Sequence, residues 1–364
     1  MAKAKAKNAD LLNAVAEQGS LELQDKVGTP TTLTEARESV ERILQYPTVR
    51  DEFYGLIGKI ATQVVYGKAF QNPLKEFKKE KLEYGIGIEQ IMLDYIEGKD
   101  FNQHYEGSDS VEGDLIKAVK PKVNARYIAK NYAYKYKITI NDNMVKQSFL
   151  NEYGFKSFID SLIEKLQSSV ELKEFKDMKK ILINAIESGK DFSGKTFEKQ
   201  DGQQELQAPF AKTGDYVNNI KLLAEDVRAM SGNLKFPSTK YNMCGVTNHT
   251  DKKDLVFFST PEIIAKLDVE VLATAFNVSA TELTTRVVEL DELPTKVCTS
   301  IGQDGQEKKV FGILVDKEFL QVRDTIYQTE SFRNADKMIT NIFSHKQGVM
   351  AECLFANMVV FVQE

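Results

Sequence analysis

The apolar positions between residues 153 and 187 recur every three or four residues, which is the spacing of one helical face. The stripe consists of Phe155, Phe158, Ile159, Leu162, Ile163, Leu166, Val170, Phe175, Met178, Ile181, Leu182, Ala185 and Ile186. Gly189 follows as a stop signal. At 1.5 Å per residue such a helix is roughly 50 Å long, so a sheet or neighbouring molecules must cover its stripe.

Apolar positions in the N-terminal third of the chain recur less regularly. Residues 1–35 are polar, which predicts a polar arm with at most a short helix over residues 10–16. Apolar spacing then predicts a helix from Thr34 that Pro47 interrupts. The stretch 53–65 predicts a second helix, or a helix that runs into a strand.

Residues 66–138 are dense in Lys, Tyr, Glu and Gly and lack long apolar runs. Tyr132, Tyr134 and Tyr136 alternate, which predicts a strand with one packed face, and residues 97–114 are acidic and glycine-rich. A polar excursion of this length is uncommon inside a compact fold. We therefore expect a hairpin-like loop that packs on another molecule.

The second half of the chain predicts an α/β unit after a polar linker over residues 190–212. The expected elements are a helix over 217–230, a strand over 254–258, a helix from Pro261 with Thr260 as its N-cap, strands over 287–290 and 310–315, and a last strand over 353–362. The last strand is apolar enough to be buried in a core.

Charge and cysteine content narrow the class of protein. The 364 residues carry 48 Lys and Arg against 53 Asp and Glu, a formal net charge of −5. That balance argues against a protein that grips nucleic acid, although not against one that encloses it. Cys244, Cys298 and Cys353 form no CxxC pair, which favours a reducing compartment without disulfides. No apolar run predicts a membrane span or a secretory signal.

Catalytic and metal-binding patterns are missing from the sequence. His104, His249 and His345 lie in separate segments, and no HExxH, GxSxG or DxDxDG pattern occurs. Residues 189–196 (GKDFSGKT) match the letters of the phosphate-binding pattern GxxxxGK[ST]. They follow the long helical stripe, whereas a phosphate loop follows a strand and opens a helix, so we do not predict a phosphate loop there. We therefore predict no catalytic residue, no cofactor and no metal site. An α/β enzyme with a mobile lid stays open as a less favoured alternative.

A basic run at the start of the polar excursion has two interpretations. Lys75, Lys78 and Lys79 could be a solvated face, which is the common outcome for charge runs. Alternatively, Leu74 and Phe77 supply apolar anchors within a charged rim that clasps an acidic patch on a neighbouring subunit. We take these five residues as candidate inter-subunit contacts.

Five blocks of sequence together carry a family resemblance. They are NPLKEFKK with GIGIEQIMLDYIEG, then FKSFIDSLIEKLQSSVELKEFKDMKKILIN, KLDVEVLATAFN, ILVDKEFLQVRD and CLFANMVVFV. In this order they resemble the major head protein of phi-twenty-nine-like small podophages, from about Val64 onward. The resemblance implies an α+β fold of the Hong Kong ninety-seven type.

The family implies names for the parts of the chain. The expected division is an N-terminal arm over 1–35, a peripheral domain over 36–65, 141–212 and 346–364 that holds the long helix, an extended loop over 66–140 that reaches an adjacent subunit, and an axial domain over 213–345. Some members add an immunoglobulin-like domain, which we expect to be absent here because the sequence stops at Glu364.

The resemblance also implies a function. It indicates a capsid protein, not an enzyme, that self-assembles into an icosahedral or elongated icosahedral head around the double-stranded DNA of a tailed phage. Implied partners are copies of the chain in pentamers and hexamers, a scaffolding protein, a portal, and DNA enclosed without sequence-specific binding. The chain would be made in the host cytoplasm and reside in the virion. A tail or head-associated component with a related fold is the alternative.

The candidate contacts give this function a first test. Replacing Lys75, Lys78 and Lys79 by Glu is expected to abolish shell formation and to leave the monomer folded.

Overall fold

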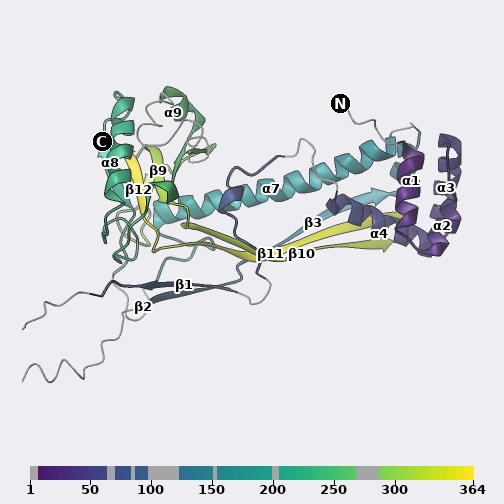
Figure 1. Ribbon diagram of the computed structural model, residues 1–364, viewed down its shortest axis with the longest axis horizontal. Helices are drawn as coiled ribbons and strands as arrows, with labels where there is room; N and C mark the ends of the chain where they lie inside the picture. Colours follow the sequence, from purple (N-terminus) through teal and green to yellow (C-terminus); the bar gives the residue numbers. More distant parts are fainter. Residues whose placement is uncertain are drawn as a thin grey trace, which may run out of the picture.

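The computed structural model describes residues 7–63, 70–82, 87–96, 123–150, 154–198, 205–267 and 287–364. A long helix, α7 (Gly154–Ser188), joins a group of helices at one end of the molecule to a five-stranded sheet at the other (Figure 1). A three-stranded sheet runs beside α7. The predicted α+β class is confirmed.

Helix α7 matches its predicted bounds to within one residue at each end. It ends at Gly189, whose φ of +58° is a left-handed conformation that favours glycine. Over its second half, Met178, Ile181 and Leu182 are buried in the largest apolar cluster of the molecule. The predicted apolar stripe is therefore covered by the chain itself at this end.

The five-stranded sheet has the order β4 (Phe210–Gly214), β12 (Met358–Gln363), β9 (Val310–Asp316), β5 (Leu255–Ser259) and β6 (Val287–Glu289). Strand β12 is parallel to β4 and antiparallel to β9. One face of the sheet packs in the same cluster as α7, and the other packs on α8 (Ile220–Asn233). Burial on both faces explains why these strands are almost continuously apolar.

The three-stranded sheet has the order β10 (Leu320–Asn334), β11 (Ile339–Glu352) and β3 (Tyr132–Asn141). It contains the strand that the alternating tyrosines predicted. All neighbouring strands in it are antiparallel, and Tyr134 packs under the Lys173 ammonium of α7. The sheet therefore combines residues that we had assigned to the extended loop and to the axial domain.

The expected grouping of segments differs from these sheets. Residues 358–363 form a strand, as predicted, and its hydrogen-bonded neighbours are β4 and β9 of the five-stranded sheet. Residues 320–345 leave the five-stranded sheet and pair with β3. The local pattern could not show this, because strand partners far apart in the sequence are chosen by tertiary packing. The division into peripheral and axial domains stays a prediction.

The N-terminal segment is helical. It forms α1 (Asn8–Glu17), α2 (Leu21–Val27), α3 (Leu33–Gln45) and α4 (Pro47–Gln63), which pack with α6 (Asp142–Ser148) and the start of α7. The predicted short helix and the interruption at Pro47 are confirmed. The predicted polar arm is wrong for residues 8–35. Helices in this segment bury apolar side chains, which the polar composition of the segment did not reveal.

Short elements complete the described residues. They are the 3-10 helices η1 (Lys75–Phe77) and η2 (Lys252–Asp254), the helix α9 (Pro261–Lys266), and the antiparallel pairs β1 (Gly87–Leu93) with β2 (Val123–Ala129) and β7 (Lys296–Val297) with β8 (Gln306–Glu307). Helix α9 begins at Pro261 as predicted. The rest of that predicted helix, His104 and the acidic stretch 97–114 lie outside the described residues.

Candidate assembly surface

The five predicted contact residues lie together, but against their own chain. Leu74 and Phe77 are 1% and 3% exposed within the largest apolar cluster, and the Phe77 ring lies 5.6 Å from that of Phe258. They anchor the segment to the core. Their burial leaves them no surface for a neighbouring subunit, which corrects the role predicted for them.

Lys78 and Lys79 of the same segment form ion pairs with carboxylates of their own chain. Lys78 Nζ lies 2.6 Å from Asp324 Oδ2 and 3.2 Å from Glu174 Oε1. Lys79 Nζ lies 2.6 Å from Glu318 Oε1. Burial disfavours the charged form of Lys78, yet the two carboxylates hold the pKa of its ammonium above the usual lysine value.

Lys75 differs from the other two lysines. Its side chain is 68% exposed, and its ammonium lies 3.6 Å from Glu171. An inter-subunit role stays a prediction for Lys75, whereas Lys78 and Lys79 are held by tertiary ion pairs.

The β1–β2 hairpin has one face docked on the chain. Gln90 Nε2 donates to the Glu352 carbonyl at 3.1 Å, and Arg126 Nη1 donates to the same oxygen at 3.0 Å. Arg126 Nη2 also lies 2.6 Å from Glu352 Oε1. Burial raises the pKa of the Glu352 carboxyl, and Arg126 opposes that shift. Apolar contacts flank these bonds, from Ile88 and Ile128 of the hairpin to Val349 and Ala351 of β11.

The opposite face of the hairpin is apolar and exposed. Ile91, Leu93, Val123 and Tyr127 are 58%, 56%, 51% and 59% exposed. The register sets Leu93 opposite Val123, and Ile91 opposite Ala125, so these side chains share one face. A contiguous exposed apolar patch on a protein surface marks an interaction site. We call this set of five residues the hairpin free face.

The sequence held a signal for this face that we did not use. The run IEQIML is apolar at positions of both parities, so a strand there has apolar residues on both faces. One face packs on β11, and the other is exposed among the described residues.

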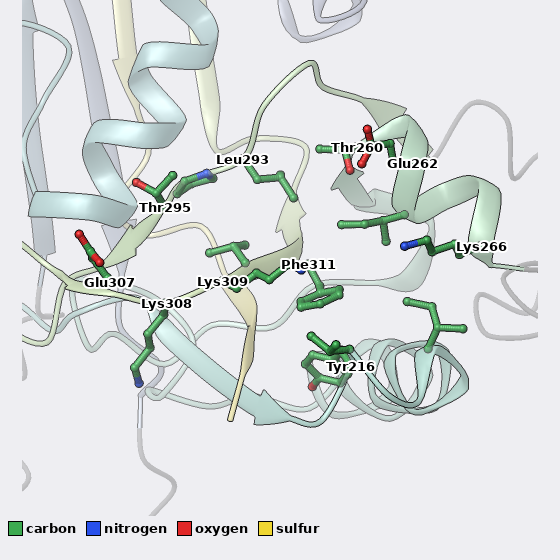
Figure 2. Close-up of a pocket in the computed structure, with 15 residues that line it drawn as sticks. Tyr216, Thr260, Glu262, Lys266, Leu293, Thr295, Glu307, Lys308, Lys309 and Phe311 are labelled. Carbon is green, nitrogen blue, oxygen red and sulfur yellow. The ribbon is translucent and has the colours of Figure 1, made fainter.

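A pocket of about 620 Å³ lies in the unit built on the five-stranded sheet (Figure 2). The Tyr216 and Phe311 rings form part of its wall, and residues around Thr260, Thr295 and Lys309 line the rest. No His, Cys or Asp occurs among its described lining residues. Its polar lining groups are hydroxyls such as those of Thr260 and Thr295, the carboxylates of Glu262 and Glu307, and lysine ammonium groups.

The two described histidines lie in different surroundings. His249 contacts the Tyr95 hydroxyl at 3.0 Å, whereas His345 stacks on Phe343 in β11. Burial raises the pKa of Cys244 to about 12, which keeps its thiol protonated and unreactive. Within the described ranges, no three His, Cys, Asp or Glu residues are placed to hold a metal ion. No helix in that part of the chain is long and apolar enough to cross a membrane.

Comparisons with known proteins agree with the resemblance. A family model described as Phi29-like phage major capsid protein matches residues 12–362. The major capsid protein of Bacillus phage B103 is 29% identical over 359 residues, which cover 97% of this chain and 72% of that protein. The major capsid protein of Bacillus phage GA-1 is 28% identical over 321 residues, 88% of this chain. The match spans 62% of the GA-1 protein, less than two thirds of its length.

Solved structures agree on the fold. A chain in the capsid structure of Staphylococcus phage Andhra has a TM-score of 0.61 at 13% identity, with 83% of this chain and 86% of that chain covered. A chain in the capsid structure of the cyanophage P-SCSP1u has a TM-score of 0.52 at 10% identity, with 83% and 90% covered. The fold is therefore that of phage capsid subunits.

Proposed function

The chain belongs to the family of Phi29-like phage major capsid proteins, and on that premise we propose that it self-assembles into the closed head shell of a tailed phage. The hairpin free face is the observation that carries this proposal, because isolated copies leave it in water. Burying it against another copy removes that exposure. Family membership supports a structural role for the chain.

The proposed contact between copies is between unlike surfaces. The hairpin free face of one copy would meet a different surface on the next copy, which is a heterologous contact that closes into rings. We propose pentamers and hexamers of the chain in an icosahedral or elongated icosahedral shell. Many such overlaps act together, so individually weak contacts hold the shell.

The remaining partners belong to the same proposal. A scaffolding protein and a portal would take part in assembly, after synthesis in the host cytoplasm, and the finished shell would enclose double-stranded DNA in the virion. The formal net charge of −5 supports enclosure without tight binding, because retention by counterion release needs a concentrated excess of Lys and Arg.

The test changes the hairpin free face alone. In Ile91→Ser/Leu93→Ser/Val123→Ser, we expect shells to be lost while the circular dichroism spectrum and melting temperature stay near those of the parent, because these side chains are more than half exposed. Negative-stain images and sedimentation velocity of the parent and the variant, with any required scaffold present, measure shell formation.

A matched control removes an exposed apolar side chain elsewhere. Leu21 is 83% exposed on α2, so Leu21→Ser lowers surface hydrophobicity without touching the hairpin. We expect it to assemble. A parent chain that stays monomeric, or a triple serine variant that builds normal shells, would refute the proposed role of the hairpin free face.

A further inference from the structure

Asp324 lies where both ends of the hairpin meet the body of the chain. Its backbone carbonyl accepts the Leu82 N–H at 2.9 Å, on the segment that enters the hairpin. Its carboxylate accepts the hydroxyl of Tyr132, on the strand that leaves the hairpin. The register of β10 with β11 shifts between Asp324 and Ile326. Such a bulge changes the direction in which side chains of the strand point.

Four charged side chains close a ring at this point. Lys78 bonds to Asp324 and Glu174 at 2.6 and 3.2 Å, and Lys346 lies 2.5 Å from Glu174 and 3.8 Å from Asp324. The side chains of Lys346 and Glu174 are each 5% exposed. We call these four residues the charge ring; it has no net charge and joins the segment after η1 to α7, β10 and β11.

Gly348 gives the charge ring its space. It faces Asp324 across the β10–β11 register. A Cβ at this position would collide with the Tyr132 hydroxyl and with the Arg323 carbonyl. A glycine here therefore lets Tyr132 cross β11 and reach Asp324.

Stability alone does not account for such a ring. Taking four charges out of water costs roughly as much as their pairing returns, and neutral residues of similar volume often stabilise a protein as well. The charge ring restricts the relative orientation of the segments that it joins. Each ion pair requires a particular distance and direction, whereas apolar contacts allow many orientations.

We propose that Lys78, Glu174, Asp324 and Lys346 are positioning residues that fix the hairpin relative to α7. They thereby set the angle at which the hairpin free face meets the next copy. This inference rests on the proposed assembly function.

The test neutralises the charge ring and measures the hairpin directly. The variant is Lys78→Met/Glu174→Gln/Asp324→Asn/Lys346→Met. Spin labels at Glu89→Cys on the hairpin and Ser169→Cys on α7 report the distance between them in unassembled protein. Both positions are exposed, whereas Cys244 and Cys298 are buried, and the half-buried Cys353 is replaced by Ala in every labelled chain. We expect the narrow distance distribution of the parent to broaden while the melting temperature is retained. Where assembly follows, the shells should lose uniform size.

A matched control neutralises another ion group on α7. Lys179 lies 2.8 Å from both Asp291 and Glu292, away from the hairpin. Lys179→Met/Asp291→Asn/Glu292→Gln is expected to keep the parent distribution. If the ring variant does not fold, Gly348→Ala serves in its place, because it displaces Tyr132 without removing a charge.

The outcomes separate the two proposals. A narrow, unchanged distance distribution in the ring variant or in Gly348→Ala overturns the positioning role, whatever happens to assembly. A parent that never forms shells overturns the assembly function, and the distance measurement on the monomer still decides whether the ring holds the hairpin.

Discussion

Lys75 and Lys78 are three residues apart on the same segment and have opposite surroundings. Lys75 projects into solvent at 68% exposure, whereas Lys78 is 26% exposed between two carboxylates. The same residue type therefore contributes little at one position and completes a buried charge ring at the other.

This difference predicts unequal effects of charge reversal. Lys75→Glu should change the free energy of unfolding by no more than about 1 kcal/mol, because its pair is exposed. Lys78→Glu should cost about 3–5 kcal/mol, since it breaks a buried pair and adds a third carboxylate beside Glu174 and Asp324. Urea denaturation followed by circular dichroism measures both.

The prediction revises the test that the sequence suggested. The triple Lys→Glu variant was expected to spare the monomer; the structure predicts that it unfolds more easily. Equal denaturation midpoints for the two single variants would contradict the tertiary role of Lys78. From the sequence LKEFKK, a cluster of apolar and basic residues could be predicted. It could not show which molecule supplies the acids, because Glu174 and Asp324 are remote in the sequence.

Among the elements, α7 was the most predictable and β10 the least. The apolar positions of α7 recur over many turns, so single polar residues among them do not obscure the helical period. Most of β10 beyond Thr325 is exposed or half-buried, and its sequence there shows no apolar alternation. Among the N-terminal helices, α2 was missed, because its seven residues contribute only a few apolar positions, too few for a periodic signal.

The end of α7 offers a test at this scale. Gly189→Ala should destabilise the protein by about 1–2 kcal/mol from the left-handed backbone alone, with a further cost from contact with Ile301. Gly194 also has a positive φ, of +83°, but open space around it. Gly194→Ala should therefore cost less than Gly189→Ala in thermal melts. The reverse order would show that Ile301 does not constrain this turn.

The whole molecule has separate apolar clusters at the two ends of α7. One is built by α1–α4, α6 and the first turns of α7, and the other by the five-stranded sheet and the last turns of α7. The sequence predicted the second core from its apolar strands. For the first core, the family resemblance implied a domain of residues 36–65 with the long helix, but residues 1–35 were left out as an arm because they look polar.

Deletion of residues 1–27 tests the first core. It removes α1 and α2, and with them the buried residues Leu12, Val15, Leu23 and Val27. We expect the truncated chain to bind the dye ANS and to melt at a lower temperature, because apolar side chains of α3, α4 and α7 become exposed. Deletion of residues 1–6 alone, which leaves α1 intact, is the control. Unchanged melting of the longer deletion would support an arm instead of a helical unit.

The position of β12 has a consequence for the timing of synthesis. Strand β4 is neighboured in its sheet by β12, and the hairpin docks on Glu352 of β11. A ribosome makes β4 and the hairpin long before it reaches either partner. The sheet therefore cannot be completed until translation has passed residue 363, and the hairpin cannot be fixed in place until it has passed residue 352. Until then, the edge of β4 that β12 covers stays unpaired in the growing chain.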